Sequence, residues 1–176
     1  MLVFDNFLPE EQFDAIKTRM MQDGIGWRFN TSTLSESDLT SEVDDNFMFT
    51  HTFWRDGAAA SPHWNLMVPI LERLQRERYF KHVGRVKANL YTNQNKTIDM
   101  ARHVDVDERI FGHEDCFVAI YFVNTCNGRS IVKVGDEFVA CESRENRMLI
   151  FDNVEHYGTV QTDTKTRVLI NFVLKP

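Results

Sequence analysis

The spacing of hydrophobic residues along the chain changes near residue 83, and before that point two segments show helical spacing. The first follows Pro9 and ends near Gly24, and three of its apolar residues share one helical face: Phe13, Ile16 and Met20. The second begins at Ser61-Pro62, where Pro69 predicts a kink or the true helix start. Its core-facing residues are Met67, Ile70, Leu71 and Leu74. We therefore predict two amphipathic helices in the N-terminal part.

From residue 83 onward, short β-branched and aromatic runs alternate with Gly, Asn and Asp, which is typical of an antiparallel sandwich or barrel. The predicted strands are 85–91, 117–124, 130–134, 137–141, 147–151, 157–162 and 166–174. Asn127-Gly128 and Gly135-Asp136 have the composition of turns between strands. Helices followed by these strands predict a mainly β (α+β) fold: a double-stranded β-helix, or jelly roll, with N-terminal supporting helices on one face.

The length of 176 residues suits one domain, and no internal repeat, low-complexity tract or change of composition divides the chain. A hydrophobic content of 43% is typical of a globular protein with a large core. We predict a single domain over residues 1–176. Residues 1–82 are expected to form helical support and outer strands, and residues 83–176 the jelly-roll core.

The net charge of −6 offers no basic stripe for phosphates and disfavours both nucleic acid and anionic membranes as partners. The three cysteines, Cys116, Cys126 and Cys141, form no Cys-x-x-Cys pair, and their odd number favours a reducing compartment. The acidic N-terminus lacks the features of a secretory signal, and no later segment has membrane-spanning length. We expect a cytoplasmic protein.

The first candidate for chemistry is the pair His103 and Asp105. Residues two apart in an extended segment point to the same side, so both side chains can reach one metal ion. Two histidines and one carboxylate on one face of a non-haem Fe(II) leave adjacent positions open for other ligands. A second match, His113 and Asp115, lies in a predicted loop without a strand-like lead-in. We therefore prefer His103 and Asp105, with a third ligand from a distant strand.

That third ligand is predicted further along the chain, where an apolar strand ends in a short loop that carries His156. His156 follows Asp105 by 51 positions, and Arg167 follows His156 by 11 at the start of the last strand. In this order and spacing the chain resembles the 2-oxoglutarate and Fe(II)-dependent oxygenase superfamily, within it the prolyl-hydroxylase-like branch. The resemblance covers roughly residues 85–174. Its FLPEE start and Thr-Asp-x-x-x-Arg-Val-x-Ile-Asn end also resemble short oxygenases of phage and marine bacterial genomes.

The resemblance implies a role for each of these residues. His103, Asp105 and His156 would be the catalytic metal ligands, and Arg167 would bind the distal carboxylate of 2-oxoglutarate, for which a guanidinium fork is well suited. Tyr91 corresponds to a tyrosine that helps to hold this cosubstrate. Strand alternation, and not the resemblance, predicts that Asn171 shares the interior face of the last strand with Arg167; Asn171 is a further cofactor-binding candidate, although a structural role is the preferred interpretation.

The resemblance also implies the reaction. The cofactors would be Fe(II), 2-oxoglutarate as cosubstrate and O2, with ascorbate as a stimulating reductant. The expected product is a hydroxylated protein side chain, such as proline, or a hydroxylated small molecule, with release of succinate and CO2.

Two alternative functions remain open. A nucleic-acid demethylase of the same superfamily is suggested by the NLY and HVDVDE segments. The acidic balance counts against it, as does Val173, which stands where that branch keeps a second arginine. A non-catalytic, metal-binding jelly roll would need no cosubstrate pocket, so Arg167 separates it from the enzyme.

Other chemistry-bearing residues have simpler interpretations. His51 and His63 have no spacing that joins them to the triad and are expected to be structural. The aromatic residues ahead of the jelly roll are interpreted as core, with a substrate-facing wall as the alternative; they are Trp27, Phe29, Phe47, Phe49 and Trp54. Segments 92–101 and 106–115 flank the predicted metal and are candidate lids.

Overall fold

The computed structural model describes residues 1–22, 24–34, 42, 46–105 and 116–176. Two α-helices, α1 (Glu10–Met21) and α2 (Val68–Glu77), and a 3-10 turn η1 (Trp64–Met67) lie in the N-terminal half of the described chain. The strands are β1 (Leu2–Phe4), β2 (Arg28–Asn30), β3 (Met48–Arg55), β4 (Ala58–Ala59), β5 (His82–Thr92), β6 (Phe117–Phe122), β7 (Arg129–Val134), β8 (Glu137–Glu142), β9 (Arg147–Asp152), β10 (His156–Gly158) and β11 (Thr166–Lys175).

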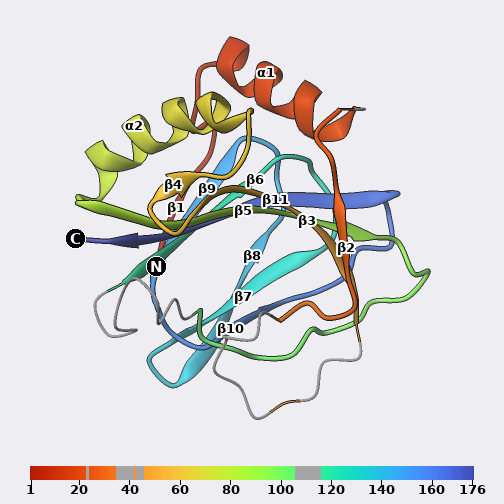
Figure 1. Ribbon diagram of the computed structural model, residues 1–176. Coiled ribbons are helices and arrows are strands. Elements are labelled where there is room, and N and C mark those ends of the chain that lie inside the picture. The colour runs from red at the N-terminus through yellow and green to blue at the C-terminus, as the bar shows by residue number, and fades with distance from the viewer. Residues whose placement is uncertain (23, 35–41, 43–45, 106–115) are drawn as a thin grey trace.

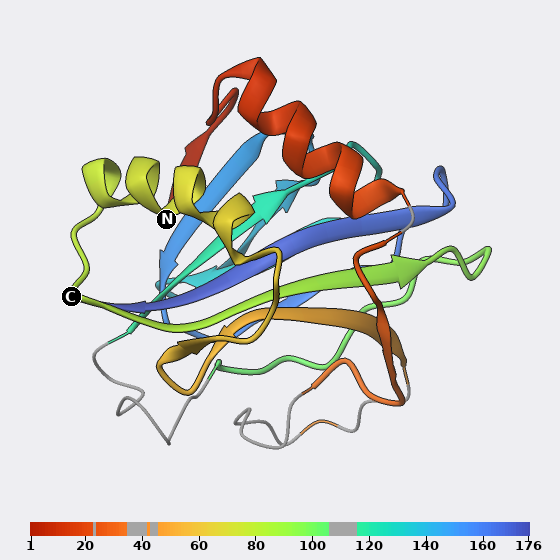
Figure 2. The same ribbon diagram turned by 45° about the horizontal axis from the view of Figure 1, so that its top comes forward.

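The strands form two antiparallel sheets. The larger has the order β1-β9-β6-β11-β5-β3-β2, with β4 paired to β3, and the smaller has the order β10-β7-β8. Figure 1 shows the smaller sheet facing one side of the larger sheet, while α1 and α2 cover its other side. The turned view in Figure 2 shows both helices across the long strands. This arrangement is the predicted mainly β jelly roll with supporting helices on one face.

The two-residue alternation of strand side chains divides the interior into two hydrophobic cores. On β11, Val168, Ile170 and Phe172 belong to the core beneath the helices, to which α1 contributes Phe13, Ile16 and Met20. Between the sheets a second core contains, among others, Val118, Ile120, Phe122, Leu149 and Leu169. Since β6 and β11 are covered on both faces, nearly all of their residues are buried. The residues of β11 predicted to face outward therefore do pack toward the helices.

Both predicted helices are present, and Pro69 lies in the first turn of α2, so it marks the true helix start. Proline is tolerated there because the first amides of a helix have no intrahelical partner. The turn between β7 and β8 uses Gly135 with a φ of +62°, as its composition predicts.

The predicted strand 157–162 is largely wrong, because β10 covers only His156–Gly158. Thr159 still bridges Asp99, but the following residues form a loop against Asn127 instead of continuing the ladder. There, Asn127 Oδ1 accepts the Thr162 amide and Asp163 accepts the Asn127 amide. Side chains of this kind compete with strand pairing for backbone groups, which ends the strand early.

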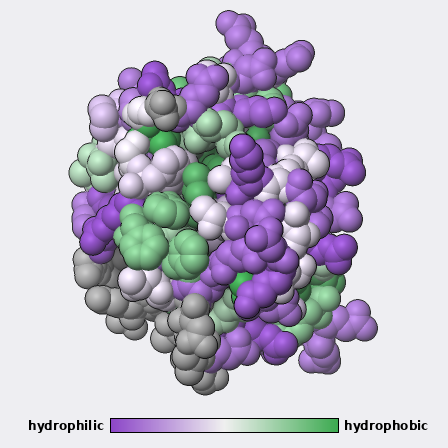
Figure 3. All heavy atoms as spheres, turned by 90° about the vertical axis from the view of Figure 1, so that its right-hand side faces the viewer, coloured by the Kyte–Doolittle hydropathy of each residue, from purple (hydrophilic) through white to green (hydrophobic). Residues whose placement is uncertain are grey.

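The aromatic residues ahead of the jelly roll divide into two groups. Trp27 and Trp54 pack against the core beneath the helices, as interpreted from the sequence. Phe29, Phe47 and Phe49 instead form a cluster with ring centroids 5.5–6.4 Å apart, in which Phe29 is 54% exposed. Figure 3 shows hydrophobic side chains gathered on the face that carries this end of the larger sheet. For these three phenylalanines the core interpretation is wrong.

Among the described residues, no helix combines the length and the hydropathy needed to cross a membrane. Cys116, Cys126 and Cys141 are all buried and form no disulfide.

Candidate metal centre

His103 and His156, far apart in sequence, lie directly opposite each other. The His103 amide donates to the His156 carbonyl at 3.0 Å, and the His156 amide donates to the His103 carbonyl at 2.9 Å. Their ring centroids are 4.5 Å apart. Asp105 follows on the same side, and one ligand atom from each of the three residues lies within 4.8 Å of the others. The backbone bridge at the end of β10 thus completes the cluster that the sequence spacing predicts.

The hydrogen bonds of both imidazoles determine which ring nitrogen can bind a metal. Nδ1 of His103 lies 3.1 Å from the Ala101 carbonyl oxygen, and Nδ1 of His156 lies 2.8 Å from that of Val154. Because a carbonyl can only accept, each Nδ1 must carry the hydrogen. Each Nε2 therefore keeps its lone pair, which is the form in which a neutral histidine ligates a metal.

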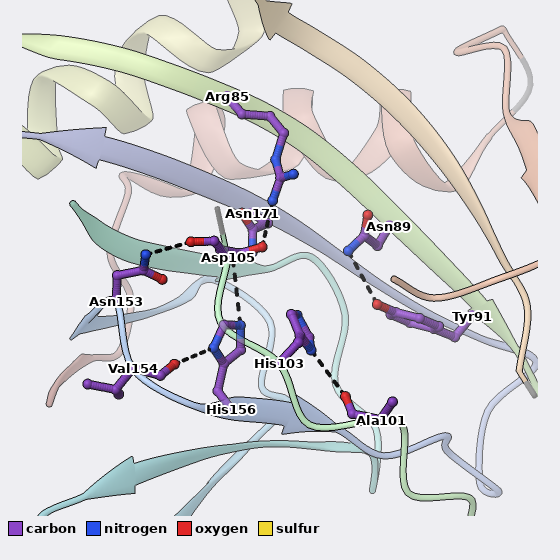
Figure 4. A network of polar contacts seen from close by, with 10 residues as sticks. All are labelled: Arg85, Asn89, Tyr91, Ala101, His103, Asp105, Asn153, Val154, His156 and Asn171. Atoms are coloured by element: carbon purple, nitrogen blue, oxygen red, sulfur yellow. Dashed lines mark hydrogen bonds and ion pairs between the residues drawn. The ribbon is translucent and has the colours of Figure 1, made fainter. Parts of the chain in front are cut away.

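The Asp105 carboxylate is held from several elements at once (Figure 4). Arg85 Nη2 on β5 donates to its Oδ1 at 2.6 Å, Asn171 Nδ2 on β11 donates to its Oδ2 at 3.1 Å, and His156 Nε2 lies 3.6 Å from Oδ2. Asn153 Nδ2 donates to the Asp105 backbone carbonyl at 2.5 Å. These contacts fix both the backbone and the side chain of Asp105.

Burial on its own raises the pKa of Asp105, but the Arg85 cation beside the carboxyl, together with the neighbouring His156 ring, outweighs it. The pKa of the carboxyl is therefore held well below its ordinary value. Asp105 is ionised at neutral pH, as a metal ligand has to be.

The three clustered side chains open into a pocket between the two sheets. Its polar lining residues, besides the cluster, include Arg85, Lys87, Asn89, Tyr91, Ser130, Arg167 and Asn171. They come mainly from the inner faces of β5 and β11. None of the five aromatic residues ahead of the jelly roll lines it, so the substrate-wall alternative gains no support from this pocket.

Arg167 is a buried cation that lacks an anionic partner among the described residues. Its side chain is 1% exposed, and its hydrogen-bonding partners are two hydroxyls, Ser143 Oγ at 2.8 Å from Nε and Ser130 Oγ at 2.9 Å from Nη2. Its guanidinium also lies 5.7 Å from the centre of the Tyr91 ring. Burial lowers the pKa of Arg167, because desolvation disfavours the charged form. A buried cation with neutral partners alone is costly, which points to an anion that binds in this pocket.

Two glycines make room for the Arg167 side chain. A Cβ on Gly128 would lie 2.6 Å from Arg167 Cδ, and a Cβ on Gly158 would lie 3.2 Å from Arg167 Nη1. The first of these distances is shorter than any real contact, so residue 128 has to be glycine while Arg167 keeps this position.

Tyr91 and Asn171, the two remaining cofactor candidates, both line the pocket. Asn89 Nδ2 donates to the Tyr91 hydroxyl at 3.2 Å. Asn171 uses Nδ2 for Asp105, and its buried Oδ1 has no hydrogen-bond partner within the described part of the chain. Both residues thus have polar atoms near the cluster.

The residue that the sequence reasoning missed is Arg85. It is 8% exposed and ion-pairs with Asp105. In the antiparallel register Arg85 lies opposite Val173 on β11. Although position 173 carries a valine, Arg85 on the neighbouring strand thus supplies an arginine to this part of the pocket. The same two-residue alternation that places Lys87, Asn89 and Tyr91 on one face of the strand also places Arg85 there, so the sequence could have indicated that Arg85 faces the pocket.

The remaining sequence predictions concern the second His-x-Asp match, the two candidate lids and the two N-terminal histidines. His113, Asp115 and the candidate lid 106–115 lie outside the described residues. Segment 92–101 is hydrogen-bonded to the end of β10, for example from the Met100 amide to the Gly158 carbonyl at 2.9 Å. His51 and His63 have local partners, among them the Gly26 carbonyl, Ser61 Oγ and the Gly24 carbonyl, and neither lines the pocket.

No protein-family model matches the sequence, and no curated protein sequence matches it. Solved structures do match, over 99% of this chain in each case. A 2-oxoglutarate-Fe(II) oxygenase-family oxidoreductase from Burkholderia pseudomallei matches with a TM-score of 0.69, 7% identity and 84% of its own chain covered. A Trichoplax adhaerens prolyl hydroxylase in complex with a peptide fragment of hypoxia inducible factor gives 0.63, 13% and 83%. A prolyl-4-hydroxylase from Pseudomonas putida gives 0.60, 12% and 92%.

These matches cover both sheets and the supporting helices, and the identities are low enough that they speak for the fold alone. On that fold, two histidines and an aspartate converge beside a buried arginine. The chain has the jelly-roll fold of the 2-oxoglutarate and Fe(II)-dependent oxygenases.

Proposed function

We propose that this protein is an Fe(II)- and 2-oxoglutarate-dependent dioxygenase that hydroxylates a C–H bond of its substrate. The observation that carries the proposal is the buried Arg167, which has no carboxylate partner among the described residues and lines the same pocket as His103, Asp105 and His156. The triad alone supports only a metal site. A dicarboxylate that ligates the metal at one end and pairs with Arg167 at the other accounts for both features.

The donor set fits Fe(II). His103 Nε2, His156 Nε2 and an Asp105 carboxylate oxygen would hold the ion, and these two-nitrogen, one-oxygen ligands without a thiolate are typical of non-haem iron oxygenases. Both tautomers and the ionised carboxylate are already in the ligating form.

The pocket also fits the cosubstrate. Arg167 would pair with the distal carboxylate of 2-oxoglutarate through its guanidinium fork. The Tyr91 hydroxyl, which accepts a hydrogen bond from Asn89, lines the same pocket and would donate to the same carboxylate. Asn171, beside Asp105, would contact the metal-binding end of the cosubstrate. The carboxylate would supply the counter-charge that Arg167 lacks.

When bound, iron and 2-oxoglutarate supply the oxidising chemistry: O2, 2-oxoglutarate and a substrate C–H bond yield succinate, CO2 and the hydroxylated product. The residues of this chain bind and orient. His103, Asp105 and His156 hold one face of the ion, and Arg167 fixes the cosubstrate. The two sheets around the pocket limit access of water to it.

For the substrate, we propose a protein side chain, such as proline, or a small molecule. Prolyl hydroxylases from two organisms are among the solved structures with the same fold, which supports the first class. The acidic balance of the chain supports neither nucleic acid nor an anionic membrane.

The test is succinate formation from 2-oxoglutarate with Fe(II) and ascorbate, combined with direct measurement of metal and 2-oxoglutarate binding. Binding is included because turnover without the true substrate is often low. We expect His103→Ala to abolish metal binding and turnover, and Arg167→Ala to retain the metal but lose the cosubstrate. His63→Ala is the matched control, since the His63 side chain contacts the Gly24 carbonyl at 3.2 Å and the His51 ring and does not line the pocket. Turnover that persists in His103→Ala would refute the ligand assignment.

A nucleic-acid demethylase is the second candidate, because Arg85 lies opposite Val173 and supplies an arginine at this place in the pocket. Binding to alkylated single-stranded DNA at moderate salt separates the two functions. Micromolar affinity would favour the demethylase, and no binding would favour the proposal above. A metal-binding jelly roll without catalysis would bind the ion and show no affinity for 2-oxoglutarate.

A further inference from the structure

The Asp105 carboxylate divides its two oxygens between different partners. Oδ1 receives the 2.6 Å hydrogen bond from Arg85 Nη2. Oδ2 receives the longer 3.1 Å bond from Asn171 and is the oxygen that lies 3.6 Å from His156 Nε2. The 2.6 Å bond from Arg85 therefore goes to the oxygen other than the one that lies beside the histidine ligand atom.

From this division we propose that Arg85 is a positioning residue that holds Asp105 Oδ1 and presents Oδ2 alone to the metal. The inference rests on the proposed function and deepens it. A carboxylate can bind a metal through one oxygen or through both, and a second bound oxygen occupies a further coordination position. With two histidines, a single carboxylate oxygen leaves three adjacent positions for the cosubstrate and oxygen. Arg85 keeps that number at three.

The position of Arg85 suits this role. It lies on the inner face of β5, opposite Val173 of β11, and its side chain is 10% exposed, against 3% for Asp105. A charge-assisted bond between two groups so removed from water is strong and directional. In Figure 4 the Asp105 carboxylate lies between the Arg85 guanidinium on one side and the two imidazole rings on the other. Arg85 therefore approaches the carboxylate from the side away from the histidines.

The backbone of Asp105 is held independently of Arg85. Asn153 Nδ2 donates to its carbonyl, and the hydrogen bonds between His103 and His156 fix the chain two residues earlier. Loss of Arg85 would therefore release Oδ1, leaving the longer Asn171 bond to Oδ2, while Asp105 stays beside the two histidines. The expected result is a metal that still binds but gains a second Asp105 oxygen.

The experiment uses Arg85→Gln and Arg85→Lys in the full chain, with Co(II) as a stable metal probe. Arg147→Gln is the matched control, because Arg147 also pairs with an aspartate, Asp5, at 2.6 Å but does not line the pocket. Calorimetric titration gives the Co(II) affinity of each protein, then the 2-oxoglutarate affinity of each Co(II)-loaded protein. The visible absorption of bound Co(II) reports its coordination independently.

For Arg85→Gln we expect Co(II) affinity within about threefold of the unsubstituted protein, because both histidines and Asp105 still reach the ion. 2-Oxoglutarate affinity should fall at least about tenfold, which is the scale on which loss of an outer partner of a metal ligand lowers metal affinity or activity. The Co(II) spectrum should change before 2-oxoglutarate is added. Arg85→Lys, which keeps the charge but loses the fork, should recover part of the affinity. Arg147→Gln should match the unsubstituted protein. If Arg85→Gln does not fold, the same affinities and the same Co(II) spectrum are compared between Arg85→Lys and the unsubstituted protein.

Three results would overturn the inference. Unchanged 2-oxoglutarate affinity and an unchanged Co(II) spectrum in the Arg85 variants would show that Arg85 does not limit ligation. Equal losses of metal and 2-oxoglutarate affinity would show that it only keeps Asp105 within reach of the ion. Absence of Co(II) and 2-oxoglutarate binding by the unsubstituted protein would overturn the proposed function as well, so the two failures are distinguishable.

Discussion

Replacement of Arg167 by methionine should remove most of the binding of 2-oxoglutarate while leaving the binding of the metal intact. Methionine keeps much of the side-chain volume and removes the charge, while the three residues of the metal cluster are untouched. The change removes a buried cation, whose desolvation costs several kcal/mol, and two hydrogen bonds to serine hydroxyls worth about 1.5–3 kcal/mol each. Because these effects oppose each other, the ligand-free variant should differ in stability by less than about 2 kcal/mol.

The effect on ligand binding should be much larger. Truncating one partner of a buried, hydrogen-bonded charge pair costs about 2–5 kcal/mol, which corresponds to a loss of affinity of about 30- to 5000-fold. At a concentration of 100 times Kd, 2-oxoglutarate stabilises the unsubstituted protein by about 2.7 kcal/mol. For a chain of 176 residues this raises Tm by about 5–10 °C. In Arg167→Met the same concentration should stabilise by at most about 0.9 kcal/mol, which corresponds to a Tm shift of about 3 °C or less.

The assay is thermal unfolding of the Co(II)-loaded protein with and without ligand. 2-Oxobutyrate, which keeps the metal-binding end of 2-oxoglutarate but lacks the distal carboxylate, serves as the second ligand. The unsubstituted protein should prefer 2-oxoglutarate strongly, and Arg167→Met should bind both equally weakly. Arg147→Met controls for loss of an arginine elsewhere. If Arg167→Met still prefers 2-oxoglutarate as the unsubstituted protein does, Arg167 is not the carboxylate-binding residue.

Three further predictions concern single contacts. Gly128→Ala places a Cβ 2.6 Å from Arg167 Cδ, so 2-oxoglutarate affinity should fall at least about tenfold while Co(II) affinity is retained, both measured by titration. The hydrogen bond from Arg147 lowers the pKa of Asp5, so the pair stabilises the fold above the unfolded pKa, near 3.8, and loses this effect as pH falls. Asp5→Asn should therefore lower Tm at pH 7, and the difference from the unsubstituted protein should shrink as pH falls below 3.8. Asn146→Ala removes three hydrogen bonds of a buried amide and should cost about 3 kcal/mol in urea unfolding; a cost below 1 kcal/mol would contradict this reading.

Much of the fold was predictable because it depends on short-range periodicity. Helical spacing placed Phe13, Ile16 and Met20 on one buried face of α1, and two-residue alternation placed Arg167 and Asn171 on the inner face of β11. The exceptions arose where side chains interrupt the pattern. After Gly158 the strand pattern continues in sequence, but the loop anchored by Asn127 takes its backbone groups instead. Such competition depends on residues about 35 positions away and is not visible in a local pattern.

In the candidate site, too, local periodicity predicts which face of a strand a residue occupies but not which residue it contacts. Alternation assigns Arg85 to the inner face of β5, yet that face alone does not say what the side chain meets there. Its partner Asp105 lies 20 residues later, and only the strand register that sets Arg85 opposite Val173 brings the two within 2.6 Å. Register follows from hydrogen-bond pairing and from the irregularity after Val173, neither of which has a sequence signature. A metal ligand can thus be predicted from spacing along the chain, whereas the residue that orients it is found only when the strands are paired.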